Sequence, residues 1–206
     1  MTLKLITDFP IAYESYDHQM PKGTMHDNTH HVPFVERIEE MAEGRKLIFA
    51  DLGCSGGGLV KDFIDRGHEA IGIEGSDYSQ RNKRAEWATI PDHLHTADIT
   101  KPFFISDENR TAGICDVITA WDVMEHITEN DLNGLLANIR NNLKVGGLFV
   151  CSIATFPDEP HHVTLKEEPW WVDKFAKFKL VKLTPPAFDE SHMVRQSSFY
   201  LVLQKV

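Results

Sequence analysis

A run of glycines and small polar residues near residue 55 has the composition of a loop that approaches a ligand closely. It reads Asp51-Leu52-Gly53-Cys54-Ser55-Gly56-Gly57-Gly58, and an acidic residue, Glu74, follows it. Glycine has no Cβ and lets the backbone come near a bound molecule. An acid about 20 residues further on can accept hydrogen bonds from ribose hydroxyl groups. The pattern therefore indicates a nucleoside-binding turn.

Two common phosphate-binding loops do not fit this run. The dinucleotide fingerprint G-x-G-x-x-G cannot be placed, because Ser55 stands two residues after Gly53 and Lys61 stands three residues after Gly58. The pattern G-x-x-x-x-G-K-[ST] is absent as well. The loop is therefore less suited to a pyrophosphate or a triphosphate than to a nucleoside without one.

Histidines are the second group of residues that can do chemistry. The chain has 11 of them, and a pKa near neutral suits histidine to act as a general base. Many lie in two groups, which are His18, His26, His30 and His31 near the N-terminus and His161 and His162 late in the chain. Polar loop residues and metal ligands are the alternative interpretations. Because no carboxylate motif completes a zinc site, we predict no metal.

Alternating apolar and amphipathic segments between residues 33 and 154 must position these groups. Short apolar runs predict strands at 46–53, 69–75, 93–99, 115–123 and 146–154. Amphipathic spacing predicts helices at 33–44, 59–68, 77–88 and 131–143. Such β-α-β repetition implies a parallel sheet covered on both faces. Ligands bind such a sheet at the carboxyl ends of its strands.

The two ends of the chain differ from this alternation. Residues 1–32 show no sustained periodicity, so we expect an irregular arm. Residues 155–169 read as a loop and 169–177 as a short helix. No helix separates the strands predicted at 177–183 and 197–206, so these strands should pair antiparallel as an extension of the sheet edge.

The glycine run also carries a family resemblance. It resembles the first motif of the class I S-adenosylmethionine-dependent methyltransferases, D-x-G-x-G-x-G, at Asp51, Gly53 and Gly57, with Ser55 in place of the middle glycine. The segments at 115–127 and 143–154 are similar to later motifs of the family, so the resemblance covers about residues 46–154 in the right order. It implies a single α/β domain with a Rossmann-like, doubly wound, mostly parallel seven-stranded sheet and an antiparallel C-terminal strand.

The resemblance implies S-adenosyl-L-methionine as the cofactor and assigns residues to it. Glu74 matches the acid that holds the cofactor ribose, Asp98 the residue that meets the adenine amino group, and Ile99 the neighbour that flanks the ring. Trp121 is a candidate for lining the methionine end, with core packing as the alternative. The complete expected cofactor site is Asp51, Gly53, Cys54, Ser55, Gly57, Glu74, Gly75, Asp98, Ile99, Trp121 and His30.

A second resemblance suggests the methyl acceptor. The stretch HHVTLKEEPWW, residues 161–171, resembles the segment that leads into a late helix in small-molecule O-methyltransferases. We therefore expect transfer to a hydroxyl of a small molecule, with a sugar or a glycan precursor as the leading acceptor. His161 or His162 is favoured as the base over His126, which follows the fourth core strand. Residues 1–32 are expected to form a lid over a methyltransferase domain at 33–206.

Two alternatives remain open, N-methylation of a small amine and a non-catalytic module that only binds S-adenosylmethionine. Methylation of adenine or of a glutamine amide is disfavoured. Those branches carry N/D-P-P-Y/F after the fourth strand, where this chain has Ala120-Trp121-Asp122-Val123.

Composition and charge limit the location and partners of the protein. With 21 Lys and Arg against 31 Asp and Glu, the net charge is −10, which disfavours nucleic acids and anionic membranes as partners. The 3 cysteines form no C-x-x-C pair, so neither a disulfide framework nor a zinc ribbon is predicted. No signal peptide or membrane span is visible, so we expect a cytoplasmic protein. We expect it to be a monomer or a homodimer.

Overall fold

A seven-stranded sheet forms the centre of the computed structural model, which describes residues 3–109, 113–184, 187–195 and 197–206. The strand order is β4-β3-β2-β6-β7-β9-β8. Neighbours from β4 to β7 run parallel, whereas β9 runs antiparallel to both β7 and β8. The predicted fold class is therefore confirmed, including the antiparallel C-terminal strand. In chain order the strands are β2 (Ile48–Leu52), β3 (Glu69–Glu74), β4 (Leu94–Thr96), β6 (Cys115–Trp121), β7 (Leu143–Ile153), β8 (Leu180–Lys182) and β9 (Phe199–Lys205).

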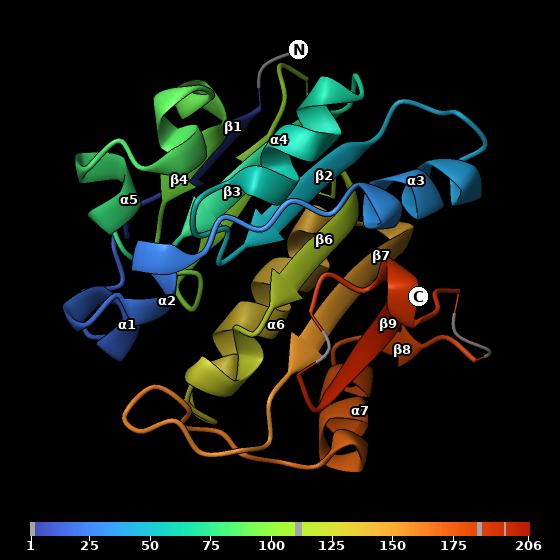
Figure 1. The fold of residues 1–206 in the computed structure, drawn as a ribbon. Helices are drawn as coiled ribbons and strands as arrows, with labels where there is room; N and C mark the ends of the chain where they lie inside the picture. The colour runs from blue at the N-terminus through green and yellow to red at the C-terminus, as the bar shows by residue number, and fades with distance from the viewer. Residues whose placement is uncertain (1–2, 110–112, 185–186, 196) are drawn as a thin grey trace.

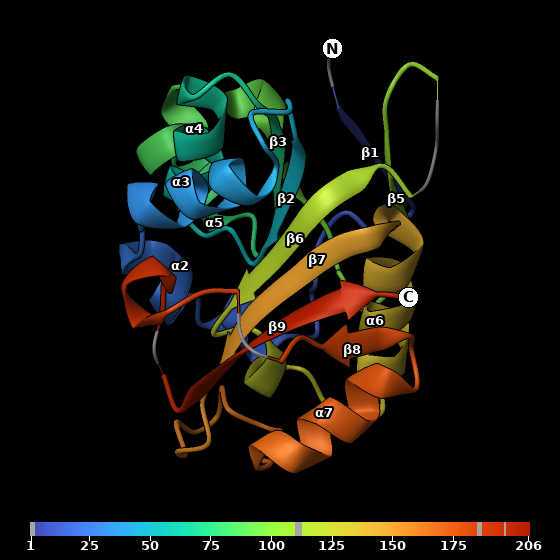
Figure 2. The ribbon, with the colours of Figure 1, turned by 90° about the vertical axis from the view of Figure 1, so that its right-hand side faces the viewer.

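Helices cover both faces of this sheet, as Figure 2 shows from the side. On one face, α3 (Val32–Met41) and α4 (Gly58–Asp65) pack through aromatic rings, and Phe63 stacks on Phe49 of β2 with centroids 3.8 Å apart. On the other, α6 (Leu132–Asn142) and α7 (Glu168–Ala176) bury leucines and Trp171. Because both faces are covered, every residue of β2 and β3 is buried.

The C-terminal strands pair antiparallel as predicted, but β9 lies inside the sheet. It is inserted between β7 and β8, so that β8 rather than β9 forms the edge (Figure 1). Short 3₁₀ turns precede two of the late elements, η3 (Met124–His126) before α6 and η4 (Glu190–His192) before β9. In the described part of the chain no helix combines the length and apolar composition that crossing a membrane requires.

The N-terminal arm is more regular than the sequence predicts. It contains β1 (Lys4–Thr7) and the short helices α1 (Tyr16–Gln19) and α2 (Lys22–His26). Strand β1 pairs antiparallel with β5 (Phe103–Ser106), a strand that the sequence analysis leaves unassigned. The elements of the arm are four or five residues long. Such short pieces show no periodicity of their own and gain stability from tertiary contacts.

The prediction of a single helix at 77–88 is wrong. The chain forms α5 (Tyr78–Arg81) and then the 3₁₀ turns η1 (Ala85–Ala88) and η2 (Pro91–His93). Lys83 and Ala85 both have φ of 48°, in the left-handed region, which ends a right-handed helix at this point. Trp87 is buried in this segment, and its indole Nε1 donates to the Ser55 carbonyl at 2.8 Å.

Candidate functional site

A cavity of about 680 Å³ opens at the carboxyl ends of β2, β3 and β6. The arm covers this end of the sheet, toward which the arrowheads of β2 and β6 point in Figure 1. Most of the residues predicted for the site line the cavity together. They are Gly53, Ser55, Glu74, Gly75, Asp98, Ile99, Trp121, His126, His161 and His162.

The glycine turn after β2 has a backbone that side chains would obstruct. Gly53 has φ of 74°, and a Cβ added there would lie 2.4 Å from Cγ2 of Val123. Ser55, which replaces the middle glycine of the motif, has φ of 47°. Its position thus requires the left-handed conformation that glycine adopts without strain. The Ser55 amide donates to Glu74 Oε2 at 2.7 Å, which ties the turn to the end of β3.

Two carboxylates follow neighbouring strands at the cavity wall. Glu74 is buried, which raises the pKa of its carboxyl group. Its Oε1 accepts a hydrogen bond from Thr24 Oγ1 of the arm at 3.3 Å. Oδ1 of Asp98 accepts from the backbone amide of Thr100 at 2.9 Å and from its hydroxyl at 2.6 Å. An ionised carboxylate has about four acceptor positions. Both groups therefore retain capacity for a ligand's hydroxyl or amino hydrogens.

Trp121 adds a donor to the same cavity. Its indole Nε1 is buried and has no hydrogen-bond partner among the described residues. The ring packs edge-on against Phe34, with centroids 5.3 Å apart. Since a buried N–H without a partner costs free energy, this donor is suited to a ligand that accepts a hydrogen bond. The turn, the two carboxylates and this donor together fit a nucleoside-containing cofactor.

Three of the predicted cofactor residues, Asp51, Cys54 and Gly57, do not line the cavity. Asp51 is buried and accepts a hydrogen bond from Thr119 Oγ1 at 2.6 Å. Burial, opposed by this bond, raises the pKa of Asp51 to about 7. Asp51 therefore supports the start of the turn through β6 instead of facing the cavity.

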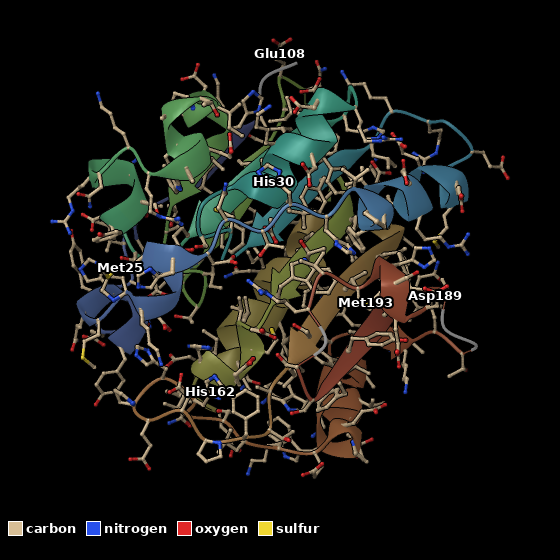
Figure 3. The ribbon with its side chains drawn as sticks, viewed as in Figure 1. Met25, His30, Glu108, His162, Asp189 and Met193 are labelled. Carbon is tan, nitrogen blue, oxygen red and sulfur yellow. The ribbon has the colours of Figure 1, made fainter. Side chains whose placement is uncertain are left out.

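His30 also lies outside the cavity lining. Its Nδ1 is 2.6 Å from Oδ1 of Asp62 in α4, and its Nε2 is 3.5 Å from Oε1 of Glu86. Figure 3 shows His30 over α4, well away from His162. The two carboxylates draw the imidazole toward α4, which the arm crosses before α3 begins.

Two of the predicted catalytic histidines, His126 and His161, contact one carboxylate of the arm. Oδ1 of Asp17 in α1 lies 3.0 Å from Nδ1 of His126 and 3.1 Å from Nδ1 of His161. Burial opposes the charged form of His126, but the hydrogen bond and charge of Asp17 outweigh it and raise the pKa of His126. The His162 ring has a different partner, because its Nδ1 donates to the Phe156 carbonyl at 2.7 Å.

Sequence reasoning missed two acidic residues of this region. Asp17 lies 109 positions before His126 in a segment without periodicity, so no local signal announces their contact. Glu125 is fully buried, its Oε1 accepts from the Ala154 amide at 3.0 Å, and Oε2 has no hydrogen-bond partner in the described residues. Burial raises the pKa of Glu125 to about 7. The sequence signal that could have identified Glu125 is its position next to His126, a predicted catalytic residue.

Trp170 and Trp171, which end the stretch 161–171, do not line the cavity. Trp171 is fully buried in α7 and stacks on Phe175 with centroids 5.9 Å apart. Lys166 and Lys174 lie over the Trp170 ring. The pair therefore serves helix packing, which is the commoner use of such residues.

A family model described as a methyltransferase domain, Methyltransf_23, matches residues 16–193. A search of curated protein sequences finds no match to the chain. The fold is similar to that of a TehB-like SAM-dependent methyltransferase from Corynebacterium glutamicum, with a TM-score of 0.58 and 18% identity, covering 95% of this chain and 98% of that one.

Two further solved structures of similar fold contain bound ligands. Geranyl diphosphate C-methyltransferase from Streptomyces coelicolor, in complex with S-adenosyl-L-homocysteine, has a TM-score of 0.54 and 18% identity, covering 84% of this chain and 80% of that one. 1,6-didemethyltoxoflavin-N1-methyltransferase from Burkholderia thailandensis, with bound 1,6-didemethyltoxoflavin and S-adenosylhomocysteine, has a TM-score of 0.54 and 16% identity, covering 91% of this chain and 82% of that one.

Proposed function

The chain belongs to the methyltransferase domain family, as an S-adenosylmethionine-dependent enzyme, and we propose that it methylates a hydroxyl group of a small molecule. In this proposal Glu74 accepts hydrogen bonds from the ribose hydroxyls, Asp98 accepts a hydrogen bond from the adenine amino group, and Ile99 flanks the adenine ring. When bound, S-adenosylmethionine supplies an electrophilic methyl group on a sulfonium sulfur. The sulfur keeps the electron pair of the broken carbon–sulfur bond and leaves as the thioether of S-adenosylhomocysteine. The residues of the chain need only orient the acceptor and receive its proton.

The observation that carries the proposal is the orientation of His162. A carbonyl oxygen only accepts, so the hydrogen bond to Phe156 places the proton of the neutral imidazole on Nδ1. Nε2 then holds the lone pair in a residue that lines the cavity. A neutral imidazole with a fixed tautomer is suited to receive the hydroxyl proton as the oxygen is methylated.

The other two histidines are less suited to that role. Nδ1 of His126 is turned toward Asp17 at 3.0 Å, so this ring is held by the arm. His161 is only 7% exposed, and its ring is turned toward Asp17. Between the two candidates of residues 161 and 162, the geometry thus favours His162.

The charge of the cavity supports a neutral, hydroxyl-rich acceptor such as a sugar or a glycan precursor. Carboxylates outnumber lysine and arginine side chains in the lining by eight to three. All three are paired with carboxylates of the lining, Lys22 with Asp158 at 3.4 Å, Lys101 with Asp131 at 3.7 Å and Arg195 with Asp27. Carboxylates accept hydrogen bonds from hydroxyl groups but repel anionic acceptors such as diphosphates. Cavities of this size commonly hold small molecules.

Incubation with S-adenosylmethionine labelled with ¹³C in its methyl group tests the proposal. A panel of sugars, other polyols and small amines is offered, and NMR distinguishes O-methyl from N-methyl products. We expect O-methyl products from the polyols and a rate of single-turnover transfer about 10²–10⁴-fold lower in His162→Gln, with unchanged cofactor affinity. His192→Gln, outside the cavity, is the matched control.

Other results would redirect the assignment. Transfer only to amines, unaffected by His162→Gln, would indicate an N-methyltransferase. Binding of S-adenosylhomocysteine without turnover on any acceptor of the panel would favour a non-catalytic binding module. Either result would contradict hydroxyl methylation by this site.

A further inference from the structure

Asp17, His126 and His161 form a cluster that the methyl-transfer proposal uses only in part. They come from three separate segments, which are α1, η3 and the loop after β7. One ligand atom from each lies within 4.8 Å of the other two, and all three residues line the cavity. The fold therefore brings two imidazoles and a carboxylate to one point.

The spacing of this cluster suits coordination of a metal ion. Imidazole nitrogens and carboxylate oxygens bind first-row divalent ions at about 2.0–2.2 Å. Two atoms 3.0–3.1 Å apart, as Asp17 Oδ1 and the two Nδ1 atoms are, subtend roughly a right angle at an ion placed at that distance. Two histidines and one carboxylate on one side of an ion leave its remaining positions open.

Glu125 belongs to a neighbouring cluster that shares His126 with the first. One of its carboxylate oxygens lies within 4.8 Å of a ring nitrogen of His126 and of His162. Its side chain is fully buried, and Oε2 has no hydrogen-bond partner in the described residues. Burying a carboxylate oxygen without a partner is costly, and a cation bound to His126, the next residue in the chain, would reduce that cost.

We propose that Asp17, His126 and His161 bind one divalent first-row transition-metal ion of the Zn²⁺ and Co²⁺ class. The nitrogen-rich ligand set favours such ions over Mg²⁺ and Ca²⁺, which prefer oxygen ligands. The ion takes Nδ1 of both imidazoles, whose protons then sit on Nε2, while Nε2 of His162 stays free. It joins the arm to the core. Its use in activating an acceptor hydroxyl rests on the function proposed above, but its binding is measurable without turnover.

Titration of the metal-stripped full chain with CoCl₂ tests this site, because bound Co²⁺ absorbs visible light. We expect about one equivalent to bind and to raise the melting temperature, since the ion binds only the folded chain. Asp17→Asn, His126→Gln and His161→Gln should each weaken the affinity at least about tenfold. His192→Gln removes a histidine outside the cavity and should bind Co²⁺ like the unmodified chain.

Calorimetric titration with S-adenosylhomocysteine shows that each variant is folded, and it separates this proposal from the function proposed above. No Co²⁺ binding by the unmodified chain would overturn the metal site and reduce the cluster to hydrogen-bonded side chains. Binding that survives all three substitutions would overturn it as well. Binding lost in Glu125→Gln and His162→Gln, but kept in Asp17→Asn and His161→Gln, would move the ion to the second cluster and refute the assignment.

Discussion

At the scale of the residue, Asp51 is an acidic residue of the glycine motif that supports the turn without lining the cavity. Its carboxyl group is buried, bonded to Thr119 and close to the negative charges of Asp27 and Glu74. Burial and these charges favour the protonated form, which is why the pKa of Asp51 is raised to about 7. Asp51 thus stabilises the start of the turn as a neutral group at mildly acidic pH.

A dependence of stability on pH follows from Asp51. Between its unfolded value of 3.8 and about 7, the folded chain holds a proton that the unfolded chain has lost. The stability contributed is complete below 3.8 and is lost as the pH rises through 7. From pH 5 to pH 7.5 the loss is on the order of 2 kcal/mol. Urea unfolding should show a shallower decline with pH for Asp51→Asn, and an equal decline in both proteins would contradict this assignment.

Gly57 permits a matched comparison of glycine substitutions. It has φ of 89°, and an added Cβ would lie 2.6 Å from Cδ1 of Leu94. Gly44 has φ of 76° but open space around it. Gly44→Ala should cost only the backbone strain, about 1–2 kcal/mol, whereas Gly57→Ala should cost about 1–3 kcal/mol more because of the overlap. Equal losses in chemical denaturation would mean that Leu94 moves aside freely.

At the scale of the element, the N-terminal arm is fastened to the strand ends through its backbone. The Ala12 amide donates to the Gly75 carbonyl at 3.0 Å, and the Asp98 amide donates to the Phe9 carbonyl at 2.9 Å. The arm also supplies Asp17, Thr24 and Asp27 to the cavity wall. We propose that residues 1–32 act as the lid of the site.

Deleting residues 1–32 should abolish methyl transfer and leave a folded domain of reduced stability. The core loses Leu3, which is 3% exposed, and β5 loses its partner strand. Circular dichroism and thermal melting report the fold, and a methyl-transfer assay reports the function. Full activity of the truncated chain would show that the arm is no lid.

What the sequence could predict differs between these elements for a physical reason. Apolar periodicity within single segments makes β2, β3, β4, β6 and β7 and the helices α3, α4 and α6 predictable from the local sequence. The arm depends on contacts such as Thr24 with Glu74, 50 positions apart, and Asp17 with His161, 144 positions apart. No local pattern encodes such pairs. The positive φ values of Lys83 and Ala85, which break the expected helix, are equally hidden, because neither residue type favours that conformation.

At the scale of the whole molecule, the parallel sheet brings groups distant in sequence to one edge. Gly53, Glu74, Asp98 and Trp121 stand at the ends of different strands, and all line one cavity. We propose that this cavity holds S-adenosylmethionine, with Glu74 accepting hydrogen bonds from the ribose. The assignments of the base, the acceptor and the lid all depend on it.

Calorimetric titration with S-adenosylhomocysteine tests that claim most directly. Glu74→Ala should weaken binding by about 1.5–3 kcal/mol, roughly 10- to 150-fold, because the lost hydrogen bonds involve a charged group. Glu167→Ala, an exposed acid outside the cavity, should bind like the unmodified chain. Thermal melting shows whether both variants are folded. Unchanged affinity in a folded Glu74→Ala variant would contradict the cofactor site.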